Sequence, residues 1–282
     1  MQVLNRHHLN GIYPTGAIYV GRGTPLGNPF AIGEETKSTR DEVVAAYTTW
    51  LDRKISELDP VILTSFAGLR ADSILVCSCS PLPCHARAIA NAWERLQGSG
   101  GVCPKRPVGT LTYAGIGSRT TPPEILRRMS KIANRLEERG YTLRSGGANG
   151  ADTAFDEGCS RKQIFLPWTG FNDRRSSFHS ISEGALGVAA AVHPAFNKLS
   201  PAAKKLMARN TYQVLGDDIR SPSDFIVCWT PDGAENESQR SRSTGGTGQA
   251  IALANRWNIP IFNLARPDAL DRLAGELRNA TV

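Results

Sequence analysis

Residues 110–119 have the sequence Thr-Leu-Thr-Tyr-Ala-Gly-Ile-Gly-Ser-Arg. The apolar run predicts a buried strand, and Gly115 and Gly117 predict a tight turn directly after it. Glycine in such a turn lets the backbone approach a ligand closely, and the helix that follows presents free N–H groups to a negative charge. This stretch therefore predicts a strand–turn–helix unit that accommodates an anion.

Two more glycine turns occur further along the chain. Ser-Gly-Gly-Ala-Asn-Gly at 145–150 follows an apolar run, and Thr-Gly-Gly-Thr-Gly-Gln at 244–249 precedes a helical pattern. The carboxyl ends of parallel strands meet at one edge of a sheet, so we expect the three turns to line one anion-binding crevice. A fourth turn, at Gly216, has no preceding strand and is left out of this site.

Strands and helices alternate regularly around these turns. Strands are expected at 110–116, 141–145, 163–167, 224–229 and 259–264. Helices are expected after a capping box at Thr121–Glu124, at 151–159, 200–214 and 248–257, and after Pro267. This alternation predicts the α/β class, with a doubly wound parallel, Rossmann-like sheet preceded by a smaller α/β domain.

The length of 282 residues favours two domains. The glycine- and proline-rich residues 97–109 predict a linker, which gives a small α/β domain at 1–96 and a nucleotide-binding domain at 110–282. In the first domain we expect strands at 17–21 and 73–78, a helix after the capping box Thr39–Glu42, and a helix at 87–96.

Composition and charge narrow the class of protein. Hydrophobic residues make up 40% of the chain, and no apolar run approaches the roughly 20 residues of a membrane span. The start of the chain lacks a secretory segment, so we expect a cytoplasmic protein with reduced cysteines and no membrane partner. A homo-oligomeric state is a separate expectation. Residues 1–100 contain nine basic and nine acidic residues, so the remaining 24 basic and 17 acidic residues carry the whole net charge of +7. This excess is either a solvated surface or a site for a nucleotide or nucleic acid.

Two common nucleotide-binding folds are poorly supported. The first turn lacks the third glycine of the dinucleotide fingerprint, and Arg144 and Ser145 stand at the second strand end in place of an acidic residue. A Gly-Lys-Ser/Thr sequence for a P-loop is also missing.

Residues 110–265 resemble the SLOG superfamily, the Rossmann-like group that includes DprA and the LOG-type nucleotide phosphoribohydrolases. The resemblance rests on the residues Tyr113–Arg119, Ser145–Asp152, Arg209-Asn210 and Thr244–Gly248, and it is closest to DprA-like proteins often carried by phages. It implies a site for a phosphorylated nucleotide or a nucleotide-derived signal. The expected ligand-binding residues are Gly115, Gly117, Ser118, Arg119, Ser145, Gly146, Gly147, Asn149, Asp152, Arg209, Asn210, Thr244, Gly245, Gly246, Thr247, Gly248 and Gln249.

Catalysis is the open question of this domain. LOG-type hydrolases carry a glutamate after their last glycine turn, and Ala252 stands at that position here. Asp152, Asp156 and Glu157 are candidate catalytic acids, although acids in the first turn of a helix also simply complement its dipole. Recognition of a small phosphorylated nucleotide, such as an ADP-ribose-like molecule, is therefore the leading hypothesis. An N-glycosidase or base-exchange enzyme and DprA-like binding of single-stranded DNA are the alternatives.

The first domain contains Cys77, Cys79, Cys84 and His85 within nine residues. Thiolate and imidazole suit zinc, so these four are candidate metal ligands; a reactive Cys84–His85 pair or simple packing are the alternatives. The cluster, with the Gly-Asn-Pro-Phe turn at 27–30, resembles a small phage and bacterial domain family of unknown function. Arg22 and Asn28 beside that turn are candidates for a second anion site.

Overall fold

The computed structural model describes residues 1–32, 38–98 and 110–279. The chain divides into two compact units, Met1–Pro104 and Lys105–Val282. Of the expected linker, Gln97 and Gly98 form the end of a helix, and residues 99–109 lie outside the described part.

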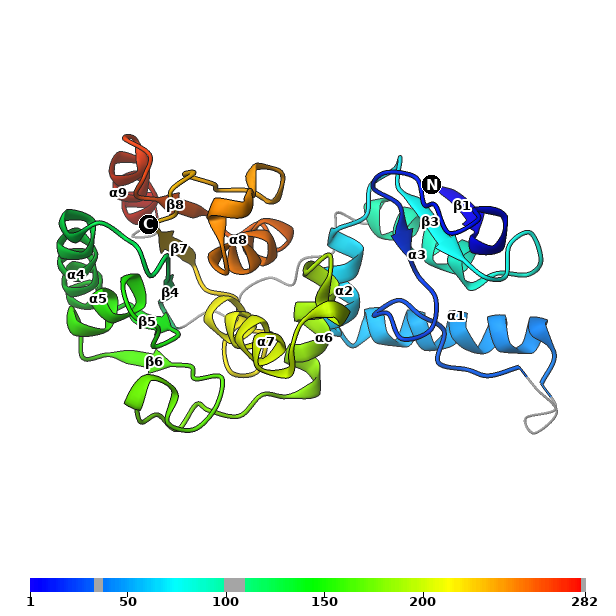
Figure 1. The fold of residues 1–282 in the computed structure, drawn as a ribbon, viewed down its shortest axis with the longest axis horizontal. Coiled ribbons are helices and arrows are strands. Elements are labelled where there is room, and N and C mark those ends of the chain that lie inside the picture. Colours follow the sequence, from blue (N-terminus) through cyan, green and yellow to red (C-terminus); the bar gives the residue numbers. More distant parts are fainter. Residues whose placement is uncertain (33–37, 99–109, 280–282) are drawn as a thin grey trace. The chain divides into compact units, whose positions relative to one another are not determined.

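The first unit is built on a parallel sheet with the strand order β1–β3–β2 (Figure 1). Its elements are β1 (Gln2–Asn5), β2 (Ile18–Tyr19), α1 (Arg40–Ser56), α2 (Pro60–Ala67), β3 (Ile74–Cys77) and α3 (His85–Gly98). Neither β1 nor α2 was predicted from the sequence. β1 is a short strand of half-buried and exposed residues, and α2 is buried over most of its length, so neither has a two-sided polar–apolar pattern.

Helix α1 begins at the predicted capping box. The backbone N–H of Thr39 donates to Glu42 Oε2 at 2.7 Å, and the Glu42 N–H donates to Thr39 Oγ1 at 3.3 Å. The buried side of α1 includes Tyr47, whose hydroxyl donates to the carbonyl of Leu26 at 2.8 Å. This bond fastens the glycine-rich turn at 21–30 to the helix.

The second unit has a fully parallel sheet with the order β6–β5–β4–β7–β8. The strands are β4 (Thr112–Gly115), β5 (Thr142–Ser145), β6 (Lys162–Ile164), β7 (Phe225–Cys228) and β8 (Ile261–Asn263). This arrangement confirms the predicted α/β fold with a Rossmann-like sheet. The strand order reverses between β4 and β7, and ligands of such sheets bind at the carboxyl ends beside that point.

The helices cover both faces of this sheet. They are α4 (Pro123–Glu138), α5 (Ala151–Glu157), α6 (Glu183–Val192), α7 (Pro201–Leu215), α8 (Thr247–Arg256) and α9 (Ala269–Asn279). Helices α4, α5 and α9 share one core cluster with the strands, while α6, α7 and α8 contact one another (Figure 1). Helix α6, which consists mostly of small residues, was not predicted from the sequence.

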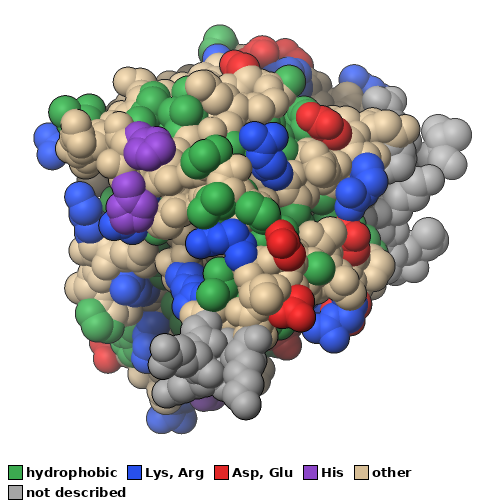
Figure 2. Space-filling view, turned by 90° about the vertical axis from the view of Figure 1, so that its right-hand side faces the viewer, with side chains coloured by type: hydrophobic (Ala, Val, Ile, Leu, Met, Phe, Trp, Pro, Cys, Tyr) green, Lys and Arg blue, Asp and Glu red, His purple; other side chains and the backbone are tan. Residues whose placement is uncertain are grey.

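The surface of the molecule carries charges of both signs. On the face shown in Figure 2, basic side chains are spread widely and acidic side chains lie among them.

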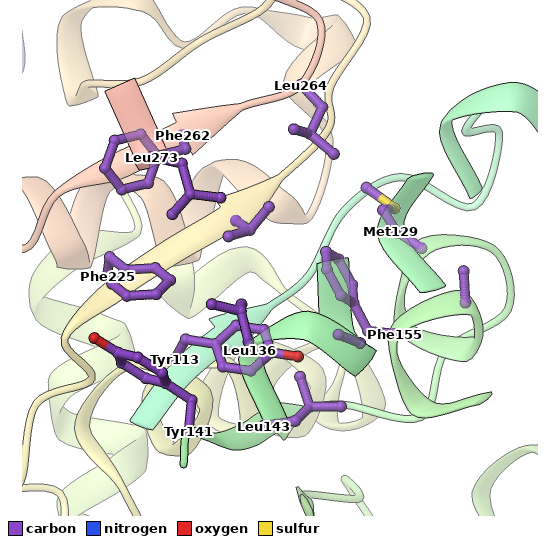
Figure 3. Close-up of a cluster of buried hydrophobic side chains, with 14 of the residues drawn as sticks. Tyr113, Met129, Leu136, Tyr141, Leu143, Phe155, Phe225, Phe262, Leu264 and Leu273 are labelled. Carbon is purple, nitrogen blue, oxygen red and sulfur yellow. The ribbon is translucent and has the colours of Figure 1, made fainter. Parts of the chain in front are cut away.

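Aromatic side chains from neighbouring strands fill the centre of the second unit. Tyr113 on β4 packs on Phe225 on β7 with ring centroids 6.0 Å apart, and Tyr141 and Phe262 lie 5.3 and 5.9 Å from the same Phe225 ring (Figure 3). Phe155 of α5 meets Tyr113 edge-on. Burial of each large side chain stabilises the fold by roughly 1.5–3 kcal/mol, which holds the strand ends in place.

One predicted helix start is wrong. Pro122, not Thr121, is the N-cap of α4, and it has no side-chain cap. Pro123 disfavours helical dihedral angles at the residue before it, and Pro122 is accordingly extended with ψ 146°, so the helix begins only at Pro123. The Thr121 hydroxyl instead donates to the carbonyl of Ser118 at 2.7 Å, so it fixes the end of the first glycine turn.

Candidate functional site

A cavity of about 270 Å³ lies at the carboxyl ends of β4 and β5, next to the point between β4 and β7 where the strand order reverses. It is bordered by the turn after β4, the turn after β5, the middle of α7 and the start of α8. The lining residues are Ile116, Gly117, Ser118, Arg119, Ala148, Asp152, Leu206, Met207, Arg209, Asn210, Gln213, Ser243, Thr244, Gly245, Gly246, Thr247 and Ala250. The three glycine turns and the Arg-Asn pair thus contribute residues to one site.

Some glycines of the first and second turns make room for neighbouring side chains. A Cβ atom on Gly146 would lie 1.0 Å from Arg209 Nη1, so the turn and the guanidinium occupy adjacent space that only glycine leaves free. Gly115 is similarly enclosed by Phe155 and Leu143. These glycines position the site without lining the cavity.

The glycines of the third turn are different. A Cβ atom on Gly245 would meet nothing within 4 Å, and one on Gly246 would meet only Met207 Cε at 3.8 Å. Gly246 has ordinary helical dihedral angles. Both glycines border open space, and they keep the cavity wide beside the start of α8.

Arg209 and Asp152 form a buried ion pair in the wall of the cavity. Arg209 Nη1 donates to Asp152 Oδ2 at 3.1 Å, and the same oxygen accepts the N–H of Ala148 at 3.2 Å. Burial raises the pKa of Asp152 and lowers the pKa of Arg209, and the charge of each partner opposes the shift of the other. Arg209 is 7% exposed, and its Nε–H has no partner within the described residues.

Arg119 supplies an exposed second guanidinium to the cavity, and it forms no ion pair within the part of the chain that the structure describes. Its charge contributes to lowering the pKa of Arg209. Helix α8 follows the N-cap Gly246, which offers no side-chain cap. The N–H groups of Gly248 and Gln249 donate to the carbonyls of Gly245 and Gly246 at 3.2 and 3.3 Å, so the N–H groups of Gly246 and Thr247 are left without a hydrogen-bond partner within the described residues. Because Asp152 already neutralises Arg209, Arg119 and the α8 terminus leave the cavity net positive.

The polar loop before α8 is ordered by its own hydrogen bonds. Asp232 accepts from the hydroxyls of Ser241 at 2.6 Å, of Ser243 at 3.4 Å and of Thr244. Burial works against ionisation, but the bonds from Ser241 and Thr244 hold the pKa of Asp232 below its usual range. The Asp232 carboxylate thereby places Thr244 in the cavity wall.

A second cavity of about 450 Å³ adjoins the first. It shares Met207, Thr244, Gly245 and Gly246 with it. The remaining lining residues are His193, Pro194, Glu237, Arg240, Ser241, Gly248 and Gln249. Gln249 donates through Nε2 to the carbonyl of Ala189 at 3.1 Å, and its buried Oε1 has no partner within the described residues.

Most of the expected ligand-binding residues line one of these two cavities. Gly115, Ser145, Gly146, Gly147 and Asn149 line neither. The sequence analysis did not name Leu206, Met207 or Gln213, which lie on α7 close to Arg209 at helical spacing. That spacing around the Arg-Asn pair was the available signal.

The three candidate acids are in different surroundings. Asp152 lines the first cavity but is ion-paired. Asp156 binds Lys162 at 2.7 Å and also Arg174, while Glu157 is exposed, and neither acid lines the two cavities. Among the described lining residues of the first cavity, Asp152 is the sole carboxylate, and an acid-catalysed reaction there would have to use it.

The thiols of the first unit converge. The sulfur of Cys84 lies 3.1 Å from those of Cys77 and Cys79, which are themselves 3.5 Å apart. His85 Nε2 contacts the carbonyl of Val20 at 2.7 Å, which directs Nδ1 to Cys79 Sγ at 3.3 Å. The three cysteine sulfurs are placed so that they could hold a metal ion.

The pKa values of these thiols are shifted in different directions. Hydrogen bonds from Cys79 and Cys84 lower the pKa of Cys77, and the bond to Cys77 raises the pKa of Cys79. The first thiolate to form is thus stabilised by its neighbours, and further thiolates need a cation nearby.

Comparisons with known proteins assign no activity. Residues 4–95, about a third of the chain, match a family described as a domain of unknown function (DUF4326), in agreement with the resemblance expected for the first domain. A solved structure of DNA processing protein A from Helicobacter pylori, which binds single-stranded DNA, matches with 18% identity and a TM-score of 0.36 over 59% of this chain and 72% of that one. At this TM-score the similarity is too weak to assign a function. No curated protein matches the chain. None of the described helices is long and apolar enough to span a bilayer.

Proposed function

We propose that the second unit binds the phosphate group of a nucleotide in the cavity between β4 and α8. The observation that carries this proposal is that the Arg119 guanidinium, which forms no ion pair within the described residues, lines the same cavity as Gly246 and Thr247, whose N–H groups remain free at the start of α8. A guanidinium and backbone N–H groups together suit the several oxygens of a phosphate. The Nε–H of Arg209 is a further buried donor at the same site.

The adjoining cavity has room for the rest of the nucleotide. It opens on the other side of Gly245 and Gly246, and the buried Gln249 Oε1 is an acceptor available to a base or ribose. Among the described residues that line the two cavities, His193 is the sole ring side chain other than proline. Proteins that hold single strands usually stack successive bases on aromatic side chains, so a free nucleotide fits these surfaces better than a strand.

Calorimetric titration of the full chain with a panel of nucleotides and ADP-ribose derivatives tests the proposal. Arg119→Gln should weaken binding by about tenfold, because it removes one charge-assisted contact without disturbing an ion pair. Arg128→Gln, an exposed arginine of α4 away from the cavity, is the matched control. Absence of binding heat with the whole panel would overturn the proposal.

Single-stranded DNA is the second candidate ligand, favoured by the excess of seven positive charges in residues 101–282. The phosphates of a strand would then cross the cavity at Arg119 and continue over exposed arginines such as Arg242. This candidate predicts an affinity that falls steeply with salt as counterions are released. Gel shifts that are absent, or that do not respond to salt, would exclude it.

The thiol cluster of the first unit is best suited to zinc. Cys77, Cys79 and Cys84 would be ligands, with sulfurs that need to move apart only slightly to reach the separations of ~3.8 Å that tetrahedral zinc–thiolate distances require. His85 Nδ1 is the nearest candidate for the fourth position, and the bond of its Nε2 to Val20 would fix the ring. The ion would provide the positive charge that three neighbouring thiolates need.

A further inference from the structure

The first unit contains a cavity of its own, of about 320 Å³, above the thiol cluster. It lies between the end of β2, the turn at 21–30, the start of α1 and the loop after β3. The lining residues are Tyr19, Gly21, Arg22, Asn28, Phe30, Ile32, Arg40, Val43, Val44, Ser78, Cys79, Pro83 and His85. Neither the nucleotide proposal nor the zinc proposal uses this space.

The described lining of this cavity carries two guanidinium groups and no carboxylate. Arg22 is held by the bond of its Nη2 to the carbonyl of Phe30 at 2.7 Å, which leaves its other donors free. Arg40, at the start of α1, forms no ion pair within the described residues. Residues 1–100 have no net charge, and acids lie among the bases on the face in Figure 2. The positive charge is thus a property of this cavity and not of the unit as a whole.

Asn28 supplies a third donor to this cavity. The residue is 8% exposed, and its Oδ1 accepts the N–H of Phe30 at 2.8 Å, which orients the side-chain amide. Its Nδ2 has no hydrogen-bond partner within the part of the chain that the structure describes and does not belong to the buried unpaired atoms there, so it is open to the cavity that Asn28 lines. An acceptor oxygen on a bound molecule would therefore find an oriented donor at this position.

The other walls suit the remainder of a small molecule. Phe30, Val43 and Val44 form an apolar side, and Cys79 and His85 form the polar end. Gly21 is needed here because a Cβ atom would lie 2.1 Å from the Tyr19 hydroxyl, which also lines the cavity. The cavity therefore combines anion-binding donors with a surface for a compact organic group.

We infer that this cavity binds a small phosphate-bearing molecule, with the phosphate between Arg22, Arg40 and the Asn28 amide. Two guanidiniums and one amide offer enough donors for several phosphate oxygens, and guanidinium geometry matches phosphate bidentately. The inference stands apart from the nucleotide site of the second unit and does not need it to be correct.

Ribose 5-phosphate is a probe of suitable size, and the side-chain amide of Asn28 reports locally on the first unit. In NMR spectra of the isotope-labelled full chain, we expect the Asn28 NH₂ signals to shift saturably with ribose 5-phosphate and to stay unmoved by ribose. Arg40→Gln should raise the dissociation constant about tenfold, because one charge-assisted contact is lost. Arg53→Gln, on the opposite end of α1 and outside the cavity, should leave it unchanged.

Asn28→Asp is the sharper variant, since it keeps the acceptor for the Phe30 N–H and replaces the free donor with a negative oxygen. Calorimetry should then show the heat from the first unit abolished. If Asn28→Asp does not fold, Arg40→Gln still decides. Asn28 signals that stay unmoved up to about 10 mM ribose 5-phosphate, where a 1 mM site would be about 90% filled, overturn the inference even if the second unit binds the probe.

Discussion

The two units solve the same problem, gathering polar groups at the ends of parallel strands, in opposite ways. In the first unit the reactive side chains are close in the sequence. Cys77, Cys79, Cys84 and His85 all lie within nine consecutive positions that begin at the end of β3. In the second unit, Arg119, Arg209 and Thr247 come from three distant segments and meet only across the sheet edge.

The two sites also differ in how their buried groups are balanced. Arg209 and Asp152 neutralise each other, so the buried charges in the wall of the first cavity are balanced before any ligand arrives. The thiols have mainly one another as partners, and their contacts favour one thiolate only. A site of the first kind is expected to fail by unpairing, and a site of the second kind by loss of the proposed zinc ion.

The largest effect should come from breaking the internal balance of the second unit. Arg209→Ala leaves Asp152 buried without its partner, and we expect the free energy of unfolding to fall by about 3–5 kcal/mol. Denaturant unfolding measures the change. The double variant with Asp152→Asn should recover part of the loss, since the unpaired charge is removed; no recovery would mean that cavity formation, not charge, dominates.

The next effect tests the zinc ion that we propose for the first unit. Purified chain should contain about one zinc per molecule by elemental analysis, and Cys84→Ser should weaken zinc binding by more than the roughly 100-fold that loss of a supporting contact can cost. Cys159→Ser, a buried thiol of the second unit away from the cluster, is the control. Equal zinc content in both variants would remove the proposal.

A smaller effect tests whether the third glycine turn keeps the nucleotide cavity open. Gly246→Val adds a side chain toward open space at helical dihedral angles, so stability should change by less than about 1 kcal/mol. Nucleotide affinity measured by calorimetry should nevertheless fall at least about tenfold, because the added methyl groups occupy the space of the ligand. Unchanged affinity would place the ligand elsewhere.

The smallest effect is the pH dependence of the loop that supports Thr244. The pKa of Asp232 is held below its unfolded value, so its stabilising contribution is present above about pH 4 and is lost as the pH falls further. Asp232→Asn should lower the melting temperature at neutral pH, and the difference from the parent chain should shrink in acid. A difference that is constant with pH would show that the carboxylate charge plays no part.

Local patterns in the sequence were sufficient for most of the strands and helices. Their alternation predicted the parallel sheet, and the clustering of Cys77, Cys79, Cys84 and His85 made these residues candidate metal ligands, with a reactive pair or simple packing as the alternatives. Prediction failed in two kinds of segment. The apolar α2 has no alternation of polar and apolar residues that would indicate a helix, and the prolines at 122 and 123 moved the start of α4 away from Thr121.

The tertiary structure alone decided which glycines border a cavity and which make room for a side chain. Gly146 and Gly246 each belong to a pair of glycines in a turn, and the sequence does not distinguish their surroundings. In the fold, the guanidinium of Arg209 occupies the space that a side chain on Gly146 would need, while Gly246 borders open space. Sequence by itself predicted a parallel sheet with glycine turns at its strand ends, because strand patterns, helix patterns and glycine turns are local properties. Whether a given turn faces solvent or a side chain depends on α7, whose position is set by packing across the sheet and not by the turn.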